Sequence, residues 1–269
     1  MIIDTHTHIY LNKELGEEEI ISWLKKSWVE KIVSIWIDLE TSQKSIDYAK
    51  KYPWIIYPVI WIHPSDVWKY KNDLEGTIKK LEKMLVDNMW LIKWIWECWF
   101  DFYRTNQDDL EEEKKLQEKF FKAQIKLAMK YSLPVIIHTR NAKEVTLEVL
   151  KEMNTKKFVL HCFSEDLDFA YKAIYYSEEC MISFSWIVTY KTATNVQNTA
   201  ANIPLSRILV ETDCPFLAPQ IVRWTENFPN NTRYILEKVC ELRQWNDKKE
   251  TSEEIENQIY ENSLKFFEI

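Results

Sequence analysis

Short apolar runs rich in β-branched residues alternate along the chain with longer amphipathic segments rich in Lys and Glu. Strands that alternate with helical segments are typical of α/β proteins with a parallel sheet. Eight such units favour closure into a (β/α)₈ TIM-barrel. The predicted strands are Ile2–Asp4, Lys31–Ile37, Ile56–Ile62, Leu91–Trp96, Pro134–His138, Phe158–His161, Met181–Ser185 and Ile208–Val210.

The amphipathic segments predict the helices around such a barrel. No Pro-, Gly- or Ser-rich linker and no charge block divides the chain, and 269 residues is about the length of one barrel. We therefore expect residues 1–269 to form a single domain. The predicted helices are Glu17–Ser27, Gln43–Lys51, Asp73–Asn88, Asp109–Tyr131, Ala142–Met153, Asp168–Tyr176, Asn195–Asn202, Thr232–Arg243 and Glu253–Lys265.

Charge and cysteine content narrow the classes of function. The chain carries 35 Lys and Arg against 42 Asp and Glu, a net charge of −7, so an extended basic surface for nucleic acid is not expected. Phosphate binding would then need help from bound cations. The five cysteines include no CxxC pair, and no apolar run is long enough for a membrane span. These features predict a cytoplasmic protein with reduced thiols and no membrane contact, and no obligate protein partner is evident from the sequence.

All five histidines fall at or just after the end of a predicted strand, which in a barrel is the active-site edge. His6 and His8 are two residues apart, so their rings project from the same face of a strand and could chelate a divalent metal. Taken alone, such a pair can equally be a surface or core pair, and a single His after a strand is often a polar cap. Convergence of His6, His8, His138 and His161 on one rim favours a metal site.

Two carboxylates share that edge, Glu97 after the fourth strand and Asp213 after the eighth. Acidic residues at such places can also be helix N-caps. Six ligands exceed the need of one tetrahedral ion, so we predict two ions. One would be bound by His6, His8 and Asp213, the other by His138 and His161, with Glu97 bridging them. Glu211, two residues before Asp213, is predicted to support a ligand.

Several motifs resemble those of TatD-type metal-dependent deoxyribonucleases, of the amidohydrolase-like superfamily. The matching segments cover residues 1 to about 230 in the family's order. They read IDTHTH from Ile3, IHP from Ile62, ECWFDFYR from Glu97, PVIIHTR from Pro134, LHCFS from Leu160 and ETDCPFLAP from Glu211. The resemblance implies a 3′-to-5′ exonuclease that acts on single-stranded DNA and often on RNA. It assigns the same six residues to metal binding and implies Mg²⁺ as the common activator, although four imidazoles favour Zn²⁺ or Mn²⁺.

The expected metal-dependent hydrolysis of phosphodiesters suggests roles for individual residues. Asp213 is predicted to bind metal and to act as the general base that orients a water, with Glu97 as the bridge. His63, Arg140 and, with weaker support, Arg104 are expected to contact phosphate. Their alternative roles are packing at a strand end for His63 and solvated or ion-paired positions for the arginines.

The residues alone allow two other functions. The first is hydrolysis of a small-molecule ester, lactone or amide, or of an aminoacyl ester, on the same scaffold. Relatives that cleave cyclic amides often bridge their metals with a carboxylated lysine, and a glutamate at position 97 favours a nuclease instead. The second is a non-catalytic metal-binding or interaction protein, which the complete ligand set disfavours.

Glycine occurs only 2 times and tryptophan 13 times, an inversion of their usual frequencies. The resembling family has glycine where this chain has Trp28, Trp36, Trp61, Trp96, Trp99, Trp186 and Trp224; Trp54, Trp68 and Trp245 also occupy plausible turn or helix-end positions. We hypothesise that UGA codons, which some bacterial lineages read as glycine, are translated here as tryptophan. Seven indoles around the strand ends would overfill a barrel mouth. The alternative is a Trp-rich variant whose indoles stack on bases.

Overall fold

The structure is a computed structural model that describes residues 1–36, 38–93, 95–101, 110–245 and 250–269, without the side chains of 17, 64, 65, 95–101 and 110. Parallel strands form two sheets, one in the order β1-β2-β3 and one in the order β4-β5-β6-β7-β8. Together they make a TIM-barrel-like α/β fold. The strands are β1 Ile2–Thr7, β2 Val29–Ser34, β3 Ile56–Pro58, β4 Ile95–Asp101, β5 Val135–Arg140, β6 Phe158–Leu160, β7 Met181–Phe184 and β8 Ile208–Val210.

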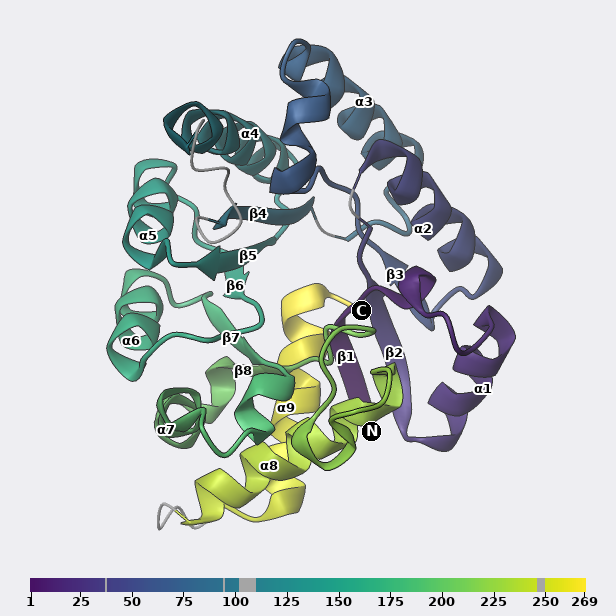
Figure 1. The fold of residues 1–269 in the computed structure, drawn as a ribbon, viewed down its shortest axis with the longest axis vertical. Helices are drawn as coiled ribbons and strands as arrows, with labels where there is room; N and C mark the ends of the chain where they lie inside the picture. The colour runs from purple at the N-terminus through teal and green to yellow at the C-terminus, as the bar shows by residue number, and fades with distance from the viewer. Residues whose placement is uncertain (37, 94, 102–109, 246–249) are drawn as a thin grey trace.

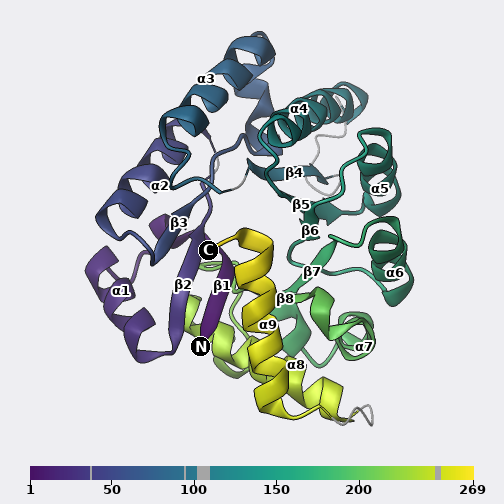
Figure 2. The same ribbon diagram turned by 180° about the vertical axis from the view of Figure 1, so that it is seen from behind.

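Helices surround the strands (Figure 1). The last helix, α9, differs from the others because it lies across one end of the ring, as Figure 2 shows in yellow. The helices are α1 Glu17–Lys26, α2 Leu39–Lys51, α3 Leu74–Asp87, α4 Leu110–Lys130, α5 Lys143–Glu152, α6 Leu167–Tyr176, α7 Thr194–Asn202, α8 Thr232–Trp245 and α9 Ser252–Phe267. Asn262 of α9 donates to the carbonyls of Leu205 and Ile208, so α9 covers the amino end of β8 and leaves the opposite end of the ring to the strand-end loops.

The two sheets meet between β8 and β1. Thr7 forms an isolated parallel bridge with Cys214. The backbone N–H of Asp213 donates to the His6 carbonyl at 2.9 Å, and that of His8 donates to the Cys214 carbonyl at 2.7 Å. Within the described residues no β-ladder joins β3 to β4.

The fourth strand begins later than the sequence pattern predicts, which corrects the range Leu91–Trp96. The N–H groups of Leu91 and Ile92 both donate to the Asn88 carbonyl, at 2.9 and 3.0 Å, so these residues complete the turn after α3. An apolar pattern cannot distinguish a helix-terminal turn from a strand start. As a result Glu97 lies inside β4 rather than after it.

The third strand is shorter than the predicted Ile56–Ile62. The Val59 N–H still donates to the Ser34 carbonyl of β2 at 3.1 Å, but the backbone N–H groups of residues 61 and 62 bond to side chains of the surrounding helices. Trp61 donates to Ser42 Oγ at 3.4 Å, and Ile62 donates to Gln124 Oε1 at 3.0 Å. Smaller corrections extend β1 to residue 7, move β2 to 29–34 and start α2 at residue 39.

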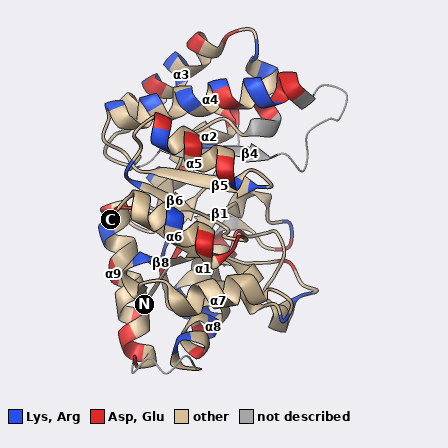
Figure 3. Cartoon of the chain, turned by 90° about the vertical axis from the view of Figure 1, so that its left-hand side faces the viewer, with Lys and Arg blue, Asp and Glu red and all other residues tan. Residues whose placement is uncertain are grey.

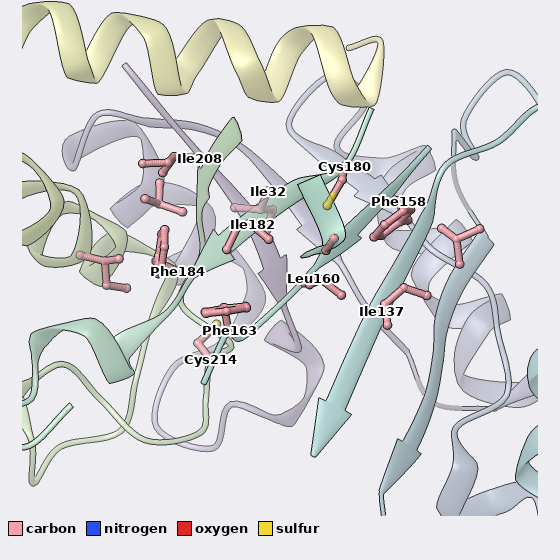
Figure 4. Close-up of a cluster of buried hydrophobic side chains, with 14 of the residues drawn as sticks. Ile32, Ile137, Phe158, Leu160, Phe163, Cys180, Ile182, Phe184, Ile208 and Cys214 are labelled. Atoms are coloured by element: carbon pink, nitrogen blue, oxygen red, sulfur yellow. The ribbon is translucent and has the colours of Figure 1, made fainter. Parts of the chain in front are cut away.

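The period of two along the strands divides the core into two layers. Residues of one parity pack against the helices in a large cluster that includes Ile137, Leu160 and Ile182 (Figure 4). Residues of the other parity, such as Ile136 and Val159, form a second cluster with Phe266 and Phe267 of α9. His138 and His161 continue the inward parity of Ile136 and Val159. Alternation therefore directs these imidazoles to the inside of the ring.

The buried carboxylate of Asp4 forms hydrogen bonds that link β1 to the segment after β8. Asp4 Oδ1 accepts from the Thr212 N–H at 2.9 Å, and Oδ2 accepts from the hydroxyls of Thr212 at 2.6 Å and Thr232 at 3.0 Å. Burial raises the pKa of Asp4 to about 7, even though these hydrogen bonds favour the charged form. Asp4 thus links the first strand to the loop after β8 and to the start of α8.

Charged residues of both signs are interspersed over the outer helices, as the blue and red segments of α3 and α4 show in Figure 3. Many form ion pairs along one helix, such as Lys79 with Glu75 at 2.6 Å. Such exposed pairs add little stability. In the described part of the chain, no helix combines the length and apolar character that a bilayer crossing requires.

Candidate metal centre and active site

β1 supplies the first two imidazoles of the site. His6 lies in the strand and His8 directly follows it, so the alternation of the strand directs both rings to the same side. Their Nε2 atoms are 3.0 Å apart, and both side chains are buried. The pair predicted from the spacing is therefore a compact pair of donor nitrogens.

β5 and β6 supply two further imidazoles. His138 lies in β5, and His161 follows β6, where its N–H donates to the Ile137 carbonyl at 2.9 Å. His138 Nδ1 lies 2.9 Å from His161 Nε2. The rings of His161 and His6 stack with centroids 4.0 Å apart. The four histidines thus form one cluster, although 155 positions separate the first from the last.

Burial and the neighbouring imidazoles His161, His8 and His138 lower the pKa of His6 well below its usual value. A protonated ring is unfavourable there because it would be desolvated and close to other rings that can carry positive charge. The neutral form is also the one that binds metal ions.

Asp213 brings a carboxylate to the first pair. Its Oδ1 lies 3.5 Å from His6 Nε2 and 3.6 Å from His8 Nε2. Asp213 has a φ of 56°, a left-handed conformation that Asp adopts more readily than most residues. The bond from its N–H to the His6 carbonyl holds this conformation beside β1. These three residues form one group able to hold a metal ion.

Glu211 is fully buried and lies behind the second pair. Its Oε1 is 3.1 Å from His161 Nδ1 and accepts from the Cys162 N–H at 2.5 Å, while Oε2 accepts from Ser183 Oγ at 2.6 Å. These contacts orient the His161 ring, as the sequence-based prediction of a supporting role requires. Glu211 also forms a second possible metal-binding group with His6 and His161.

The other predicted site residues are Glu97, Arg104, His63 and Arg140. Glu97 belongs to β4, next to β5, but its side chain lies outside the described residues. Arg104 also lies outside them. His63 and Arg140 both line the cleft above the imidazoles. The ring centroid of His63 is 5.0 Å from that of Trp61.

The donor set fits a divalent cation. Two nitrogens that each lie about 2.1 Å from one ion are about 3.0 Å apart at the right angle of an octahedral site and about 3.4 Å apart at a tetrahedral angle. The separations in the two imidazole pairs, 3.0 and 2.9 Å, are close to the octahedral value. In the described part of the chain, His8 Nδ1 is also buried with no hydrogen-bond partner. Neutral imidazoles with a carboxylate suit Zn²⁺ or Mn²⁺ on ligand chemistry.

A cleft of about 840 Å³ opens above the cluster. His8, His138, His161 and Asp213 lie in its lining, which also includes Arg140 and Arg223. The arginine residues therefore offer positive charge at the wall of a site whose floor is made of imidazoles and a carboxylate. A volume of this size holds a ligand of one to a few nucleotide-sized units.

Sequence reasoning missed two contributors to this region, Phe216 and Arg223. Phe216 is half exposed in the cleft, with its ring centroid 5.4 Å from that of His8. The Arg223 guanidinium lies 4.8 Å from the Tyr190 ring. The available signal for Phe216 was its place three residues after Asp213 in a segment with two prolines. Its place within the ETDCPFLAP motif does not by itself indicate a role.

A TIM-barrel-like fold with clustered histidines and an aspartate at the carboxyl ends of its strands defines a metal-dependent hydrolase. The chain belongs to the family described as TatD related DNase, whose model matches residues 3–268. It is 31% identical to YabD, an uncharacterized metal-dependent hydrolase of Bacillus subtilis, over 100% of both chains. It is 32% identical to an uncharacterized metal-dependent hydrolase of Mycoplasma genitalium, over 98% of each.

Solved structures agree on the fold. The chain superposes on the crystal structure of the TatD homolog YJJV of Escherichia coli with a TM-score of 0.88, at 24% identity, over 100% of this chain and 98% of that one. A TatD family hydrolase of Entamoeba histolytica gives a TM-score of 0.82 at 20% identity, over 99% and 97% of the two chains. The predicted fold class and the family resemblance are both confirmed.

Proposed function

We propose that this protein hydrolyses phosphodiester bonds of single-stranded DNA or RNA, and that it removes nucleotides from the 3′ end. The observation that carries the proposal is the arrangement of the cleft. His8 and Asp213 line it and form, with the buried His6, a group suited to a divalent cation, and its wall includes Arg140 and Arg223. Cations and arginines together would bind a phosphate despite the net charge of −7. The family description supports a nucleic acid substrate.

In this proposal His6, His8 and Asp213 would hold one ion, His138 and His161 would hold a second, and Glu97 would be a ligand common to both. Mg²⁺ is our first candidate, with Mn²⁺ or Zn²⁺ as alternatives. When bound, the ions would lower the pKa of a water and polarise phosphate oxygens. Asp213 would orient that water and accept its proton, while Glu211 would keep the His161 ring aligned. His63 and Arg140 would hold the phosphate.

The direct test is a nuclease assay on the purified protein. A 5′-labelled single-stranded oligonucleotide incubated with Mg²⁺ or Mn²⁺ should yield a ladder of successively shorter products, and a chelator should stop it. A block at the 3′ terminus should also prevent the ladder. Inactivity on DNA and RNA, combined with turnover of small esters, lactones or amides, would assign the site to the alternative hydrolase class instead.

Removal of one imidazole should weaken metal binding unequally at the two sites. His161→Ala deletes a ring that contacts His138 and Glu211, so we expect the affinity of one Mn²⁺ binding event to fall at least about 10-fold and the other to change less. Calorimetric titration of the metal-free protein measures both events. His63→Ala, which lies in the cleft outside the imidazole cluster, is the matched control and should bind Mn²⁺ as the wild type does. Equal loss at both sites would contradict the division of ligands.

Phe216 should stack on a base of the bound strand, because its half-exposed ring lies in the cleft beside His8. Base–aromatic stacking is worth about 1–3 kcal/mol, so Phe216→Ala should raise KM for single-stranded DNA about 5- to 150-fold with little change in kcat. Phe216→Tyr keeps the ring and should retain the wild-type KM. A fall in kcat alone, at constant KM, would remove Phe216 from substrate binding.

A further inference from the structure

We propose that Trp28 and Trp54 occupy positions where the natural protein carries glycine. Both have φ in the left-handed region, 65° at Trp28 and 71° at Trp54. A bulky residue there is a true outlier, because its Cβ approaches the neighbouring carbonyl oxygen at a cost that glycine avoids. This backbone evidence is independent of the residue counts that first suggested the exchange.

Trp28 occupies the position at which helices commonly end with glycine. Helix α1 ends at Lys26 and Ser27 is its C-cap, with its N–H donating to the carbonyls of Trp23 and Leu24. The next residue is the one that takes the left-handed conformation when the chain turns away from a helix, and glycine is strongly preferred there. The Trp28 carbonyl then accepts from the Ile2 N–H at 2.9 Å, so its backbone has to turn at this place to begin β2.

Trp54 occupies the third position of a tight turn between α2 and β3. The turn runs over Tyr52, Pro53, Trp54 and Ile55, and the Ile55 N–H donates to the Tyr52 carbonyl at 3.3 Å. Proline at the second position and positive φ at the third define a type II turn. That third position requires glycine, or less often asparagine.

Neither indole gains burial that could offset this strain. Trp28 is 73% exposed and Trp54 72% exposed. The two glycines of the chain, in contrast, do not adopt positive φ. Gly76 lies in the first turn of α3, where glycine is unfavourable. Glycine is therefore missing where the backbone requires it, in a chain with 2 Gly and 13 Trp.

A buried tryptophan and one at the cleft are consistent with the same exchange. Trp61 is completely buried, and in the described residues its Nε1 has no hydrogen-bond partner, which costs about 1–3 kcal/mol for a polar group. Trp186 lines the cleft, and its buried Nε1 likewise has no partner there. Glycine at Trp186 would widen the cleft above the imidazoles. Reading of UGA as glycine in the source organism would account for all of these positions.

The codons of the gene and the mass of peptides from the native protein determine which amino acid stands at positions 28 and 54. We expect UGA at codons 28 and 54, and peptides of the protein isolated from its own cells should carry glycine at both positions by mass spectrometry. UGG codons at both positions, or native peptides with tryptophan, would overturn the proposal.

Melting temperatures of variants test separately whether the positive φ at positions 28 and 54 is strained in any residue with a Cβ. Trp28→Gly and Trp54→Gly should each unfold about 2–4 °C above the matched Trp28→Ala and Trp54→Ala variants. Alanine also removes the indole but keeps the Cβ, so the difference isolates the left-handed backbone. At Trp224, which is 90% exposed and has no positive φ, glycine should be no better than alanine. Equal melting temperatures of the Gly and Ala variants at 28 and 54 would refute the backbone argument.

Discussion

Replacing Asp213 by asparagine should lower kcat about 10²- to 10⁴-fold while the protein keeps its fold. Asparagine has the same shape, and the bond from the residue 213 N–H to the His6 carbonyl would remain. The change removes the negative charge and the basic oxygen that lie 3.5 Å from His6 Nε2 and 3.6 Å from His8 Nε2. Steady-state kinetics on single-stranded DNA measure the loss, and thermal unfolding establishes that the variant is folded.

The matched control is Asp168→Asn. Asp168 is exposed on α6 and pairs along its helix with Lys172 at 2.6 Å, so its loss should leave kcat unchanged. Wild-type activity of Asp213→Asn would refute the assigned base. A variant that binds no metal and has lost its activity would instead restrict Asp213 to the role of a ligand, which the metal titration distinguishes.

Asp4→Ala should destabilise the protein by about 3 kcal/mol or more without touching the cleft directly. The substitution leaves the buried Thr212 N–H without its acceptor and removes the carboxylate that joins β1 to the loop after β8 and to α8. A buried unsatisfied donor alone costs about 1–3 kcal/mol, and the cavity adds to that. Urea-induced unfolding followed by circular dichroism gives the change in the free energy of unfolding.

Asp4→Asn is the control for this prediction. Asparagine fills the same volume and can still accept from the Thr212 N–H, while its amide can donate to a threonine hydroxyl. Burial already raises the pKa of Asp4 to about 7, so a neutral side chain suits the site. We therefore expect Asp4→Asn to lose much less stability than Asp4→Ala. Equal stability of Asp4→Ala and the wild type would show that the β1–β8 junction does not depend on this carboxylate.

Much of the architecture could be predicted from the sequence because it depends on local patterns. Alternation of apolar runs with amphipathic segments predicted all eight strands in order. The predicted first and last residues of these strands were less accurate. Residues such as Leu91 and Ile62 have the character of strand residues, but their N–H groups bond to a helix terminus and to a glutamine of α4. Competition between such partners cannot be inferred from hydrophobicity alone.

For the site, the residue types and the strand period were enough to predict that His6 and His8 form a pair, because both lie on one short segment. They also predicted that His138 and His161 approach it, because parallel strands end at the same edge. Which carboxylate contacts which imidazole was not predictable. Glu211 was expected to support a ligand, but only the structure identifies that ligand as His161, with Ser183 and Cys162 holding the carboxylate.

The linear order of residues determined the succession of strands and helices and the set of side chains that face the inside of the ring, since each follows from a period of two or near four along the backbone. Only the tertiary structure decided that Asp4 joins β1 to Thr212, a residue 208 positions away, and that the rings of His6 and His161 stack. Contacts of this kind depend on distances between segments that no local periodicity encodes.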